Sequence, residues 1–172
     1  VFRPADAMET AECWELSLTN KHGPALLALS RQNLPQLRTD VSENLCAKGA
    51  YRLRAAGAAR KVVLMATGSE VELAVKVADA LEAKGIGADV VSMPSWELFA
   101  AQSSAYRADL LPANALKVSI EAGVTLGWQI HTGLDGLNFG IDTFGASAPA
   151  EALYAHFGLS VENIVPQIEA KL

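Results

Sequence analysis

Arg31 is the residue best suited to bind an anionic ligand. It follows residues 25–29, an apolar run without alternation that predicts a strand buried on both faces. Arg31 would then lie at the carboxyl end of that strand, where open α/β sheets bind ligands, and its planar guanidinium can bind a phosphate through two hydrogen bonds. The alternative is a structural ion pair with a carboxylate such as Asp6, and physical reasoning alone weights the two interpretations about equally.

Glu121 is a candidate general base. It directly follows the apolar run 116–120 and precedes Ala122 and Gly123, so it too would lie at the carboxyl end of a buried strand. A carboxyl group in such a place can have a pKa suited to proton transfer. The alternative is that Glu121 accepts hydrogen bonds from backbone N–H groups of the next loop, and we favour it because no partner is identified in the sequence.

A glycine turn, Thr67-Gly68-Ser69-Glu70, joins the apolar run 62–66 to a predicted helix. Free N–H groups at the start of a helix attract anions. Neither a dinucleotide-binding glycine pattern nor a P-loop pattern accompanies this turn, and we therefore favour a purely structural role for it.

The histidines and cysteines point to no further chemistry. His22, His131 and His156 are isolated in the sequence, without the spacing of a zinc site and without the nucleophile elbow of a hydrolase. Cys13 and Cys46 are the only cysteines and lie far apart in the sequence. We expect buried or idle thiols rather than a disulfide or a metal site.

Composition excludes several partners. The 14 basic residues are outnumbered by 19 acidic ones, the net charge is -5, and no run of Lys or Arg is present, so nucleic acid is not an expected partner. Without a cationic groove, Trp96, Phe99 and Trp128 are expected to be packing anchors. No apolar run has the length of a membrane span and no signal segment is present, which predicts a soluble cytoplasmic protein without a membrane partner.

The first forty residues have the pattern of the last part of another domain, and not of a domain that folds by itself. Residues 5–19 predict an amphipathic helix and residues 25–29 a buried strand, followed by a connector from about 34 to 48. One helix and one strand make no stable sheet alone. The first residue is Val rather than Met, which we interpret as the sign of a chain cut from a longer protein.

From residue 49 on, strands and helices alternate. The apolar runs predict strands, and the segments between them have helical patterns; the strands are expected at 51–53, 62–66, 88–93, 116–120 and 137–141, and the helices at 69–84, 106–111, 126–134, 150–157 and 161–172. Ser69 and Glu72 match a capping box, and Ser160 is a plausible cap for the last helix. Alternating strands and helices predict a layered α/β fold with parallel strands.

Several strings in this order resemble transketolases across essentially the whole chain. They begin with Arg3-Pro4-Ala5-Asp6 and continue with Ala28-Leu29-Ser30-Arg31-Gln32-Asn33-Leu34-Pro35, Gly49-Ala50-Tyr51, Ala66-Thr67-Gly68-Ser69-Glu70-Val71, Val91-Ser92-Met93-Pro94 and Phe144-Gly145-Ala146-Ser147-Ala148-Pro149. The Ser-Arg-Gln-Asn run before Leu-Pro, combined with the Thr-Gly-Ser-Glu-Val turn, is quite specific to that family.

The resemblance implies a three-layer α/β/α fold with a five-stranded, mostly parallel sheet. It implies that residues 1–40 are the tail of a pyrimidine-binding domain, that 41–50 are a linker and that 51–172 are the C-terminal domain of a transketolase. Such enzymes are homodimers that use thiamine diphosphate and a divalent metal such as Mg²⁺ to transfer a two-carbon ketol unit from a ketose phosphate to an aldose phosphate.

For single residues, the resemblance implies one site assignment. Arg31 matches the arginine that contacts the substrate phosphate, whereas the catalytic, cofactor-binding and metal-binding residues of the family lie upstream of Val1. This chain alone is therefore expected to be inactive and to bind no cofactor; it would contribute Arg31 and structural support to the dimer. The alternative is a free-standing α/β assembly or anion-binding module that uses the turn from Thr67 to Glu70.

Overall fold

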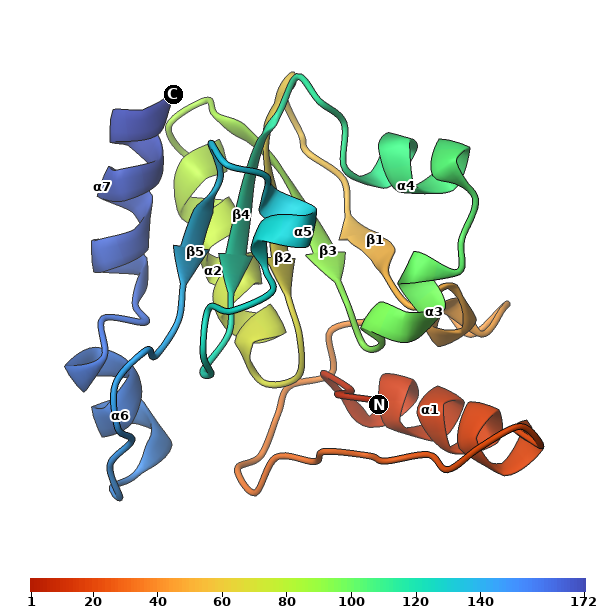
Figure 1. Cartoon of the computed structure of the whole chain (residues 1–172). Coiled ribbons are helices and arrows are strands. Elements are labelled where there is room, and N and C mark those ends of the chain that lie inside the picture. Colours follow the sequence, from red (N-terminus) through yellow and green to blue (C-terminus); the bar gives the residue numbers. More distant parts are fainter.

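A five-stranded sheet forms the middle layer of the computed structural model, which describes all 172 residues (Figure 1). The strand order is β1-β3-β2-β4-β5. The strands are β1 (Tyr51–Arg54), β2 (Arg60–Ala66), β3 (Gly87–Ser92), β4 (Leu116–Ile120) and β5 (Leu137–Phe139). β1 is antiparallel to β3 and all other neighbours are parallel. The predicted mostly parallel, five-stranded sheet is confirmed.

The central strand β2 separates two cores. Val62, Leu64 and Ala66 belong to one hydrophobic cluster, whereas Val63 and Met65 belong to another on the opposite face. All five side chains are fully buried. A parallel strand that is covered on both faces reads as a continuous apolar run, which is why the sequence pattern identified it.

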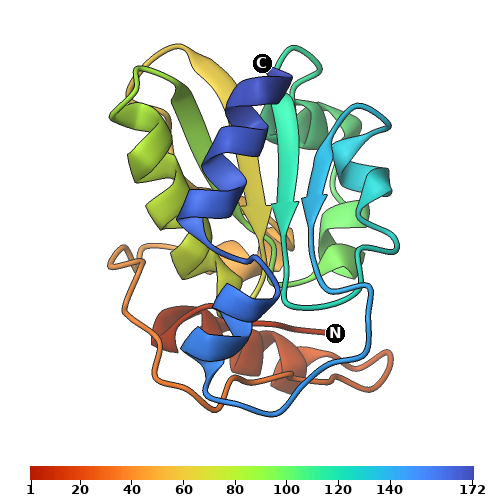
Figure 2. The same cartoon turned by 90° about the vertical axis from the view of Figure 1, so that its left-hand side faces the viewer.

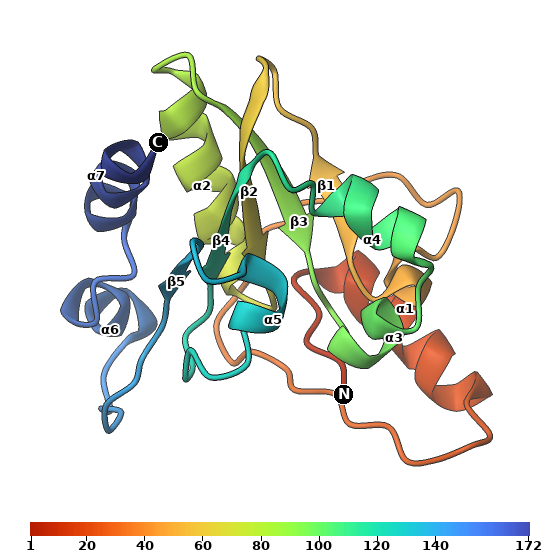
Figure 3. The same cartoon turned by 45° about the horizontal axis from the view of Figure 1, so that its top comes forward.

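Helices cover both faces of the sheet. α2 (Glu70–Glu82) and α7 (Val161–Lys171) pack over the face of Leu64, with Leu81, Ile164 and Ile168 in the core (Figure 2). α3 (Trp96–Ala100), α4 (Ser104–Leu110) and α5 (Gln129–Thr132) lie on the other side, and α6 (Ala150–His156) precedes α7 (Figure 3). This arrangement is the predicted three-layer α/β/α fold.

The predicted N-terminal cap is present in α7 but absent in α2. Ser160 caps α7 by accepting a hydrogen bond from the N–H of Asn163. The capping box of α2 is absent, because the backbone of Ser69 is already helical and its hydroxyl donates to the neighbouring Glu70 carboxylate instead. The short helix α3 was not predicted, and α5 is shorter than the expected 126–134.

The N-terminal segment lies across the carboxyl ends of the parallel strands (Figure 1). It contains α1 (Ala7–Thr19) and a 3-10 turn, η1 (Leu45–Lys48). The predicted buried strand at 25–29 is wrong: only Leu27 forms a bridge, with Phe2, and Leu26 and Leu29 are more than half exposed. A strand needs neighbours on both sides to bury both faces, and in this chain only Phe2 pairs with the run.

The predicted helix near the N-terminus is present, but its buried face includes two glutamates. Glu9, Glu12 and Cys13 are the buried residues of α1. Trp14 is 50% exposed and Leu18 77% exposed, so most of the apolar side chains in the pattern do not pack against this chain. No helix in the structure combines the length and apolar character required to cross a membrane.

Candidate functional site at the carboxyl edge of the sheet

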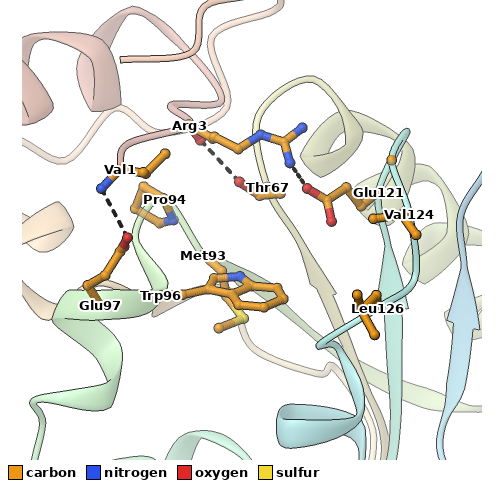
Figure 4. A pocket seen from close by; sticks show the side chains of 11 residues that line it. Val1, Arg3, Thr67, Met93, Pro94, Trp96, Glu97, Glu121, Val124 and Leu126 are labelled. Atoms are coloured by element: carbon orange, nitrogen blue, oxygen red, sulfur yellow. Dashed lines mark hydrogen bonds and ion pairs between the residues drawn. The ribbon is translucent and has the colours of Figure 1, made fainter. Parts of the chain in front are cut away.

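Arg3 lies where the N-terminal segment crosses the ends of three parallel strands. The residues that follow β2, β3 and β4 supply Thr67, Pro94 and Glu121, which surround a cavity of about 410 Å³ together with Arg3 and Trp96 (Figure 4). We call this space the carboxyl-edge cavity. It occupies the position at which open α/β sheets usually bind ligands.

The backbone of Arg3 joins the N-terminal segment to the sheet. Its N–H donates to the carbonyl of Pro94 at 2.9 Å, and its carbonyl accepts from the N–H of Gly68 at 3.0 Å. The hydroxyl of Thr67 donates to the same carbonyl at 3.4 Å. Since these bonds involve the loops after both β2 and β3, the segment has a defined position over the strand ends.

The side chain of Arg3 connects two carboxylates. Its guanidinium forms an ion pair with Glu121 and lies 3.8 Å from Oε2 of Glu70. The indole N–H of Trp128 donates to the other oxygen of Glu121 at 2.6 Å. Both oxygens of Glu121 therefore have side-chain partners, and the expectation that it accepts backbone N–H groups is wrong. These contacts leave no oxygen of Glu121 free to act as a general base.

A second space, of about 350 Å³, lies on the other side of Arg3. Glu70 lines it and is only 1% exposed. Its Oε1 accepts hydrogen bonds from the hydroxyls of Tyr154 and Ser69, both at 2.6 Å. We call this space the Tyr154 groove. Ser30 and Gln32 belong to its lining, which places the segment that carries Arg31 at its rim.

Arg31 is exposed and makes no hydrogen bond or ion pair within the chain. The alternative ion pair with Asp6 is wrong, because Asp6 is buried and accepts hydrogen bonds from the backbone N–H groups of Glu9, Leu37 and Arg38. The guanidinium of Arg31 is therefore available to a ligand. Its contact with a phosphate stays a prediction.

Several backbone donors of the glycine turn are already used within the chain. The N–H of Gly68 donates to Arg3, and the N–H of Val71 donates back to the carbonyl of Gly68 at 3.2 Å. The carboxylate of Glu70 lies at the same helix start and would repel an anion. These contacts agree with a structural role for the turn and disfavour the anion-binding alternative.

The predicted aromatic anchors are packing residues. Phe99 and Trp128 are each 1% exposed, and the ring of Trp96 lies 4.8 Å from that of Trp128. His131 packs against the same group, with its ring 4.9 Å from Trp96. Burial lowers the pKa of His131, which keeps it neutral near pH 7. The other two histidines are exposed.

A buried polar cluster that was not predicted lies between α1 and the sheet. Glu9 is 2% exposed and accepts hydrogen bonds from the hydroxyls of Tyr51 and Ser92 and from the N–H of Ala5 at 2.7 Å. Burial raises the pKa of Glu9, although the hydrogen bonds from Ser92 and Tyr51 lower it. The cluster thus attaches α1 to both β1 and β3.

Next to Glu9, an ion pair joins Glu12 to Arg38. Nη1 of Arg38 donates to Glu12 at 3.0 Å, Nη2 donates to the other oxygen, and the guanidinium lies 5.3 Å from the centre of the Tyr51 ring. Burial acts to raise the pKa of Glu12, but the hydrogen bonds from Arg38 and Cys46 hold it below its ordinary value. Both members of the pair are buried.

The two cysteines belong to the same region. Cys13 and Cys46 are free thiols, fully buried with Phe2, as predicted. The contact with Cys13 and burial both raise the pKa of Cys46, so its thiol stays protonated. One sequence signal could have identified this region: Glu9, Glu12 and Cys13 are spaced to share one face of a helix. We expected the apolar residues of that helix to be the buried ones.

The chain does not fit a metal centre of its own. No group of three or more His, Cys, Asp and Glu side chains in the structure is arranged to hold a metal ion. The acidic residues near the cavity are instead neutralised by Arg3.

Comparisons with known proteins place the chain in a family. A model of the transketolase-like TK C-terminal domain matches residues 49–160. The transketolase of Rhodobacter capsulatus is 51% identical over 99% of the chain, and that of Sinorhizobium medicae is 53% identical over 97%. The chain spans only 26% and 24% of the lengths of these two relatives.

Solved structures agree with this assignment. A transketolase from Leishmania mexicana superimposes with a TM-score of 0.87 at 41% identity, covering 98% of this chain and 24% of that one. A transketolase from Pichia stipitis in complex with sedoheptulose-7-phosphate gives a TM-score of 0.89 at 35% identity, covering 99% and 24%. The chain belongs to the transketolase family and contains its C-terminal domain.

Proposed function

We propose that this chain is the C-terminal part of a transketolase that transfers a two-carbon ketol unit from a ketose phosphate to an aldose phosphate. The support is its similarity to transketolases over nearly its whole length, while it spans about a quarter of theirs. Thiamine diphosphate and a divalent metal such as Mg²⁺ would be bound by parts of the protein outside this chain. The chain alone would be inactive, and the complete protein would be a cytoplasmic homodimer.

Arg31 is the residue of this chain that we propose to contact the substrate, through its phosphate. The observation that carries this role is the unpartnered guanidinium of Arg31 on an exposed segment whose neighbours Ser30 and Gln32 line the Tyr154 groove. The Pichia stipitis transketolase that shares this fold was solved with a sugar phosphate. A free guanidinium can bind a phosphate in a bidentate manner, with a stronger bond than a neutral donor would give.

The test is Arg31→Gln in the complete enzyme. A hydrogen bond to a charged group contributes about 1.5–3 kcal/mol, so its loss should raise KM for phosphorylated substrates by roughly tenfold or more. Unphosphorylated substrates should be converted as before. As the control, Arg107→Gln removes another exposed arginine, on α4. It should change KM for neither phosphorylated nor unphosphorylated substrates. Equal losses for phosphorylated and unphosphorylated substrates in Arg31→Gln would rule out the phosphate contact.

A further inference from the structure

Arg31 lies on a segment that has no helix or regular strand of its own. Between α1 and η1 the chain forms only the bridge at Leu27. Arg31 itself makes no hydrogen bond or ion pair, so its position depends on how the chain on either side of it is attached. The nearest attachments on its two sides both come from the segment that begins the chain.

On the N-terminal side, the backbone of Phe2 fixes the approach to Arg31. The N–H of Phe2 donates to the carbonyl of Leu26 at 2.7 Å, and the N–H of Ala28 donates to the carbonyl of Phe2 at 2.9 Å. These bonds form one short parallel bridge. They involve only main-chain atoms, and no side-chain substitution removes them selectively.

On the C-terminal side, the carboxylate of Asp6 makes the attachment nearest to Arg31, and the ion pair of Arg38 with Glu12 follows directly after it. Oδ2 of Asp6 accepts hydrogen bonds from the N–H groups of Leu37 and Arg38, both at 3.0 Å, and from the side-chain amide of Gln36 at 3.1 Å. Oδ1 accepts from the N–H of Glu9 at 2.8 Å and caps α1. Asp6 is 5% exposed, so these charge-assisted bonds are shielded from competing water.

The segment that carries Phe2 and Asp6 is in turn attached to the sheet. Arg3, between them, bonds through its backbone to Pro94 and Gly68 and through its side chain to Glu121. A continuous set of contacts therefore runs from the carboxyl edge of the sheet to both ends of the stretch 29–35, in which Arg31 lies.

We propose that Asp6 is a positioning residue for Arg31. By binding residues 36–38, Asp6 fixes the position of the chain just after Arg31. The position of the guanidinium relative to a substrate phosphate depends on this attachment. This inference rests on the proposed role of Arg31. It adds a residue that does not touch the substrate and that acts only through Arg31.

The test uses the complete enzyme with Asp6→Asn. The amide retains one oxygen for the cap of α1 but presents an NH₂ group toward the N–H donors of Leu37 and Arg38. KM for phosphorylated substrates should rise by about tenfold, as expected when hydrogen bonds to a charged group are lost. The KM for unphosphorylated substrates and kcat should change by less than about twofold. A merely structural role would lower both activities together.

Two further variants keep the test decisive. Gln36→Ala removes an exposed side chain whose amide donates to Asp6 and to the carbonyl of Arg38, so it should fold and raise the same KM by about threefold. Thr10→Ala is the matched control, because the Thr10 hydroxyl donates to the backbone carbonyl of Asp6 at 2.7 Å without touching residues 36–38. It should leave the preference for phosphorylated substrates unchanged.

A double variant separates this inference from the proposed function. In the presence of Arg31→Gln, Asp6→Asn should add less than about twofold to KM, because positioning has no value without the guanidinium. If Asp6→Asn raises KM by a further tenfold in the presence of Arg31→Gln, the role of Asp6 is overturned and that of Arg31 is left intact. The same conclusion follows if neither Asp6→Asn nor Gln36→Ala affects phosphorylated substrates selectively. A lack of phosphate selectivity in Arg31→Gln itself overturns both.

Discussion

At the residue scale, buried and partly buried carboxylates connect the N-terminal segment to the C-terminal domain. Asp6 binds the chain around residues 36–38, Glu9 binds Tyr51 and Ser92, and Glu121 binds Arg3. Each of these carboxylates has hydrogen-bond partners that offset the cost of burial. The pairing of these carboxylates is therefore part of the fold, and Glu9, whose pKa is raised by burial, should make stability depend on pH.

Glu9 provides a pH-dependent prediction. Burial raises its pKa, so the folded chain keeps the proton at pH values where the unfolded chain, with an ordinary pKa of 4.5, has lost it. The free energy of unfolding contributed by Glu9 therefore falls as pH rises from the ordinary value toward the raised one. Glu9→Gln cannot ionise and should lack this fall, as measured by urea unfolding of the 172-residue chain from acid to neutral pH.

The matched control for Glu9 is Glu43→Gln, which changes an exposed glutamate without a hydrogen bond or ion pair in the structure. It should keep the pH dependence of the unmodified chain. Because Glu12 has a lowered pKa and contributes in the opposite direction, the quantity to compare is the difference between each variant and the unmodified chain. An identical pH dependence for Glu9→Gln and the unmodified chain would contradict the assignment.

At the element scale, buried polar contacts add to a small apolar cluster around Cys13 in attaching α1. The Glu12–Arg38 pair links α1 to the chain after the Arg31 segment, and the N–H of Cys46 donates to Glu12 at 3.0 Å. The exposed Trp14 and Leu18 lie on the same helix. Removing one member of the buried pair leaves the other charged and unpaired, which is more costly than removing both.

The attachment of α1 can be measured with Arg38→Met. This variant should lower the free energy of unfolding by about 3 kcal/mol, because Glu12 is left buried without its partner. Glu12→Gln combined with Arg38→Met should lose less than Arg38→Met alone. As a control, Lys76→Met breaks an exposed pair with Glu72 on α2 and should cost no more than about 0.5 kcal/mol. A loss in Arg38→Met as small as in Lys76→Met would refute the role of this pair.

The elements show what could be predicted from the sequence. This chain alone covers both faces of β2 and β4, and their apolar runs identified them. The ends of β4 are as predicted, whereas β2 begins two residues earlier than expected. The run at 25–29 has the same pattern but lacks sheet neighbours here, so local pattern and tertiary context disagree. The same disagreement is found in α1. Its apolar pattern predicted the helix correctly, but it did not predict which face of the helix this chain buries.

The candidate site was predictable only in part. Arg31 was found because it follows an apolar run, although that run is not a strand in this structure. Arg3 was missed as a site residue, because its partners Glu121 and Glu70 are far away in the sequence and only the fold brings them together. The same holds for Asp6 and residues 36–38, whose contact depends on the path of an irregular segment.

At the scale of the whole molecule, an α/β/α sheet structure has an N-terminal segment attached across the carboxyl edge of its sheet. The family model covers residues 49–160, and the division into a tail at 1–40 and a linker at 41–50 stays a prediction. Arg31 lies in the N-terminal segment, whereas the groups that fix this segment include Arg3 and the turns of the C-terminal domain. Both parts are therefore needed to place the guanidinium.

The central claim is that this chain serves as part of a transketolase, and one assay tests it most directly. Ketol transfer from a ketose phosphate to an aldose phosphate is measured, with thiamine diphosphate and Mg²⁺, for the complete protein that contains this sequence and for the isolated 172-residue chain. We predict turnover by the complete protein that depends on thiamine diphosphate, and none by the isolated chain. A complete protein without ketol transfer, or transfer by the chain alone, would contradict the account.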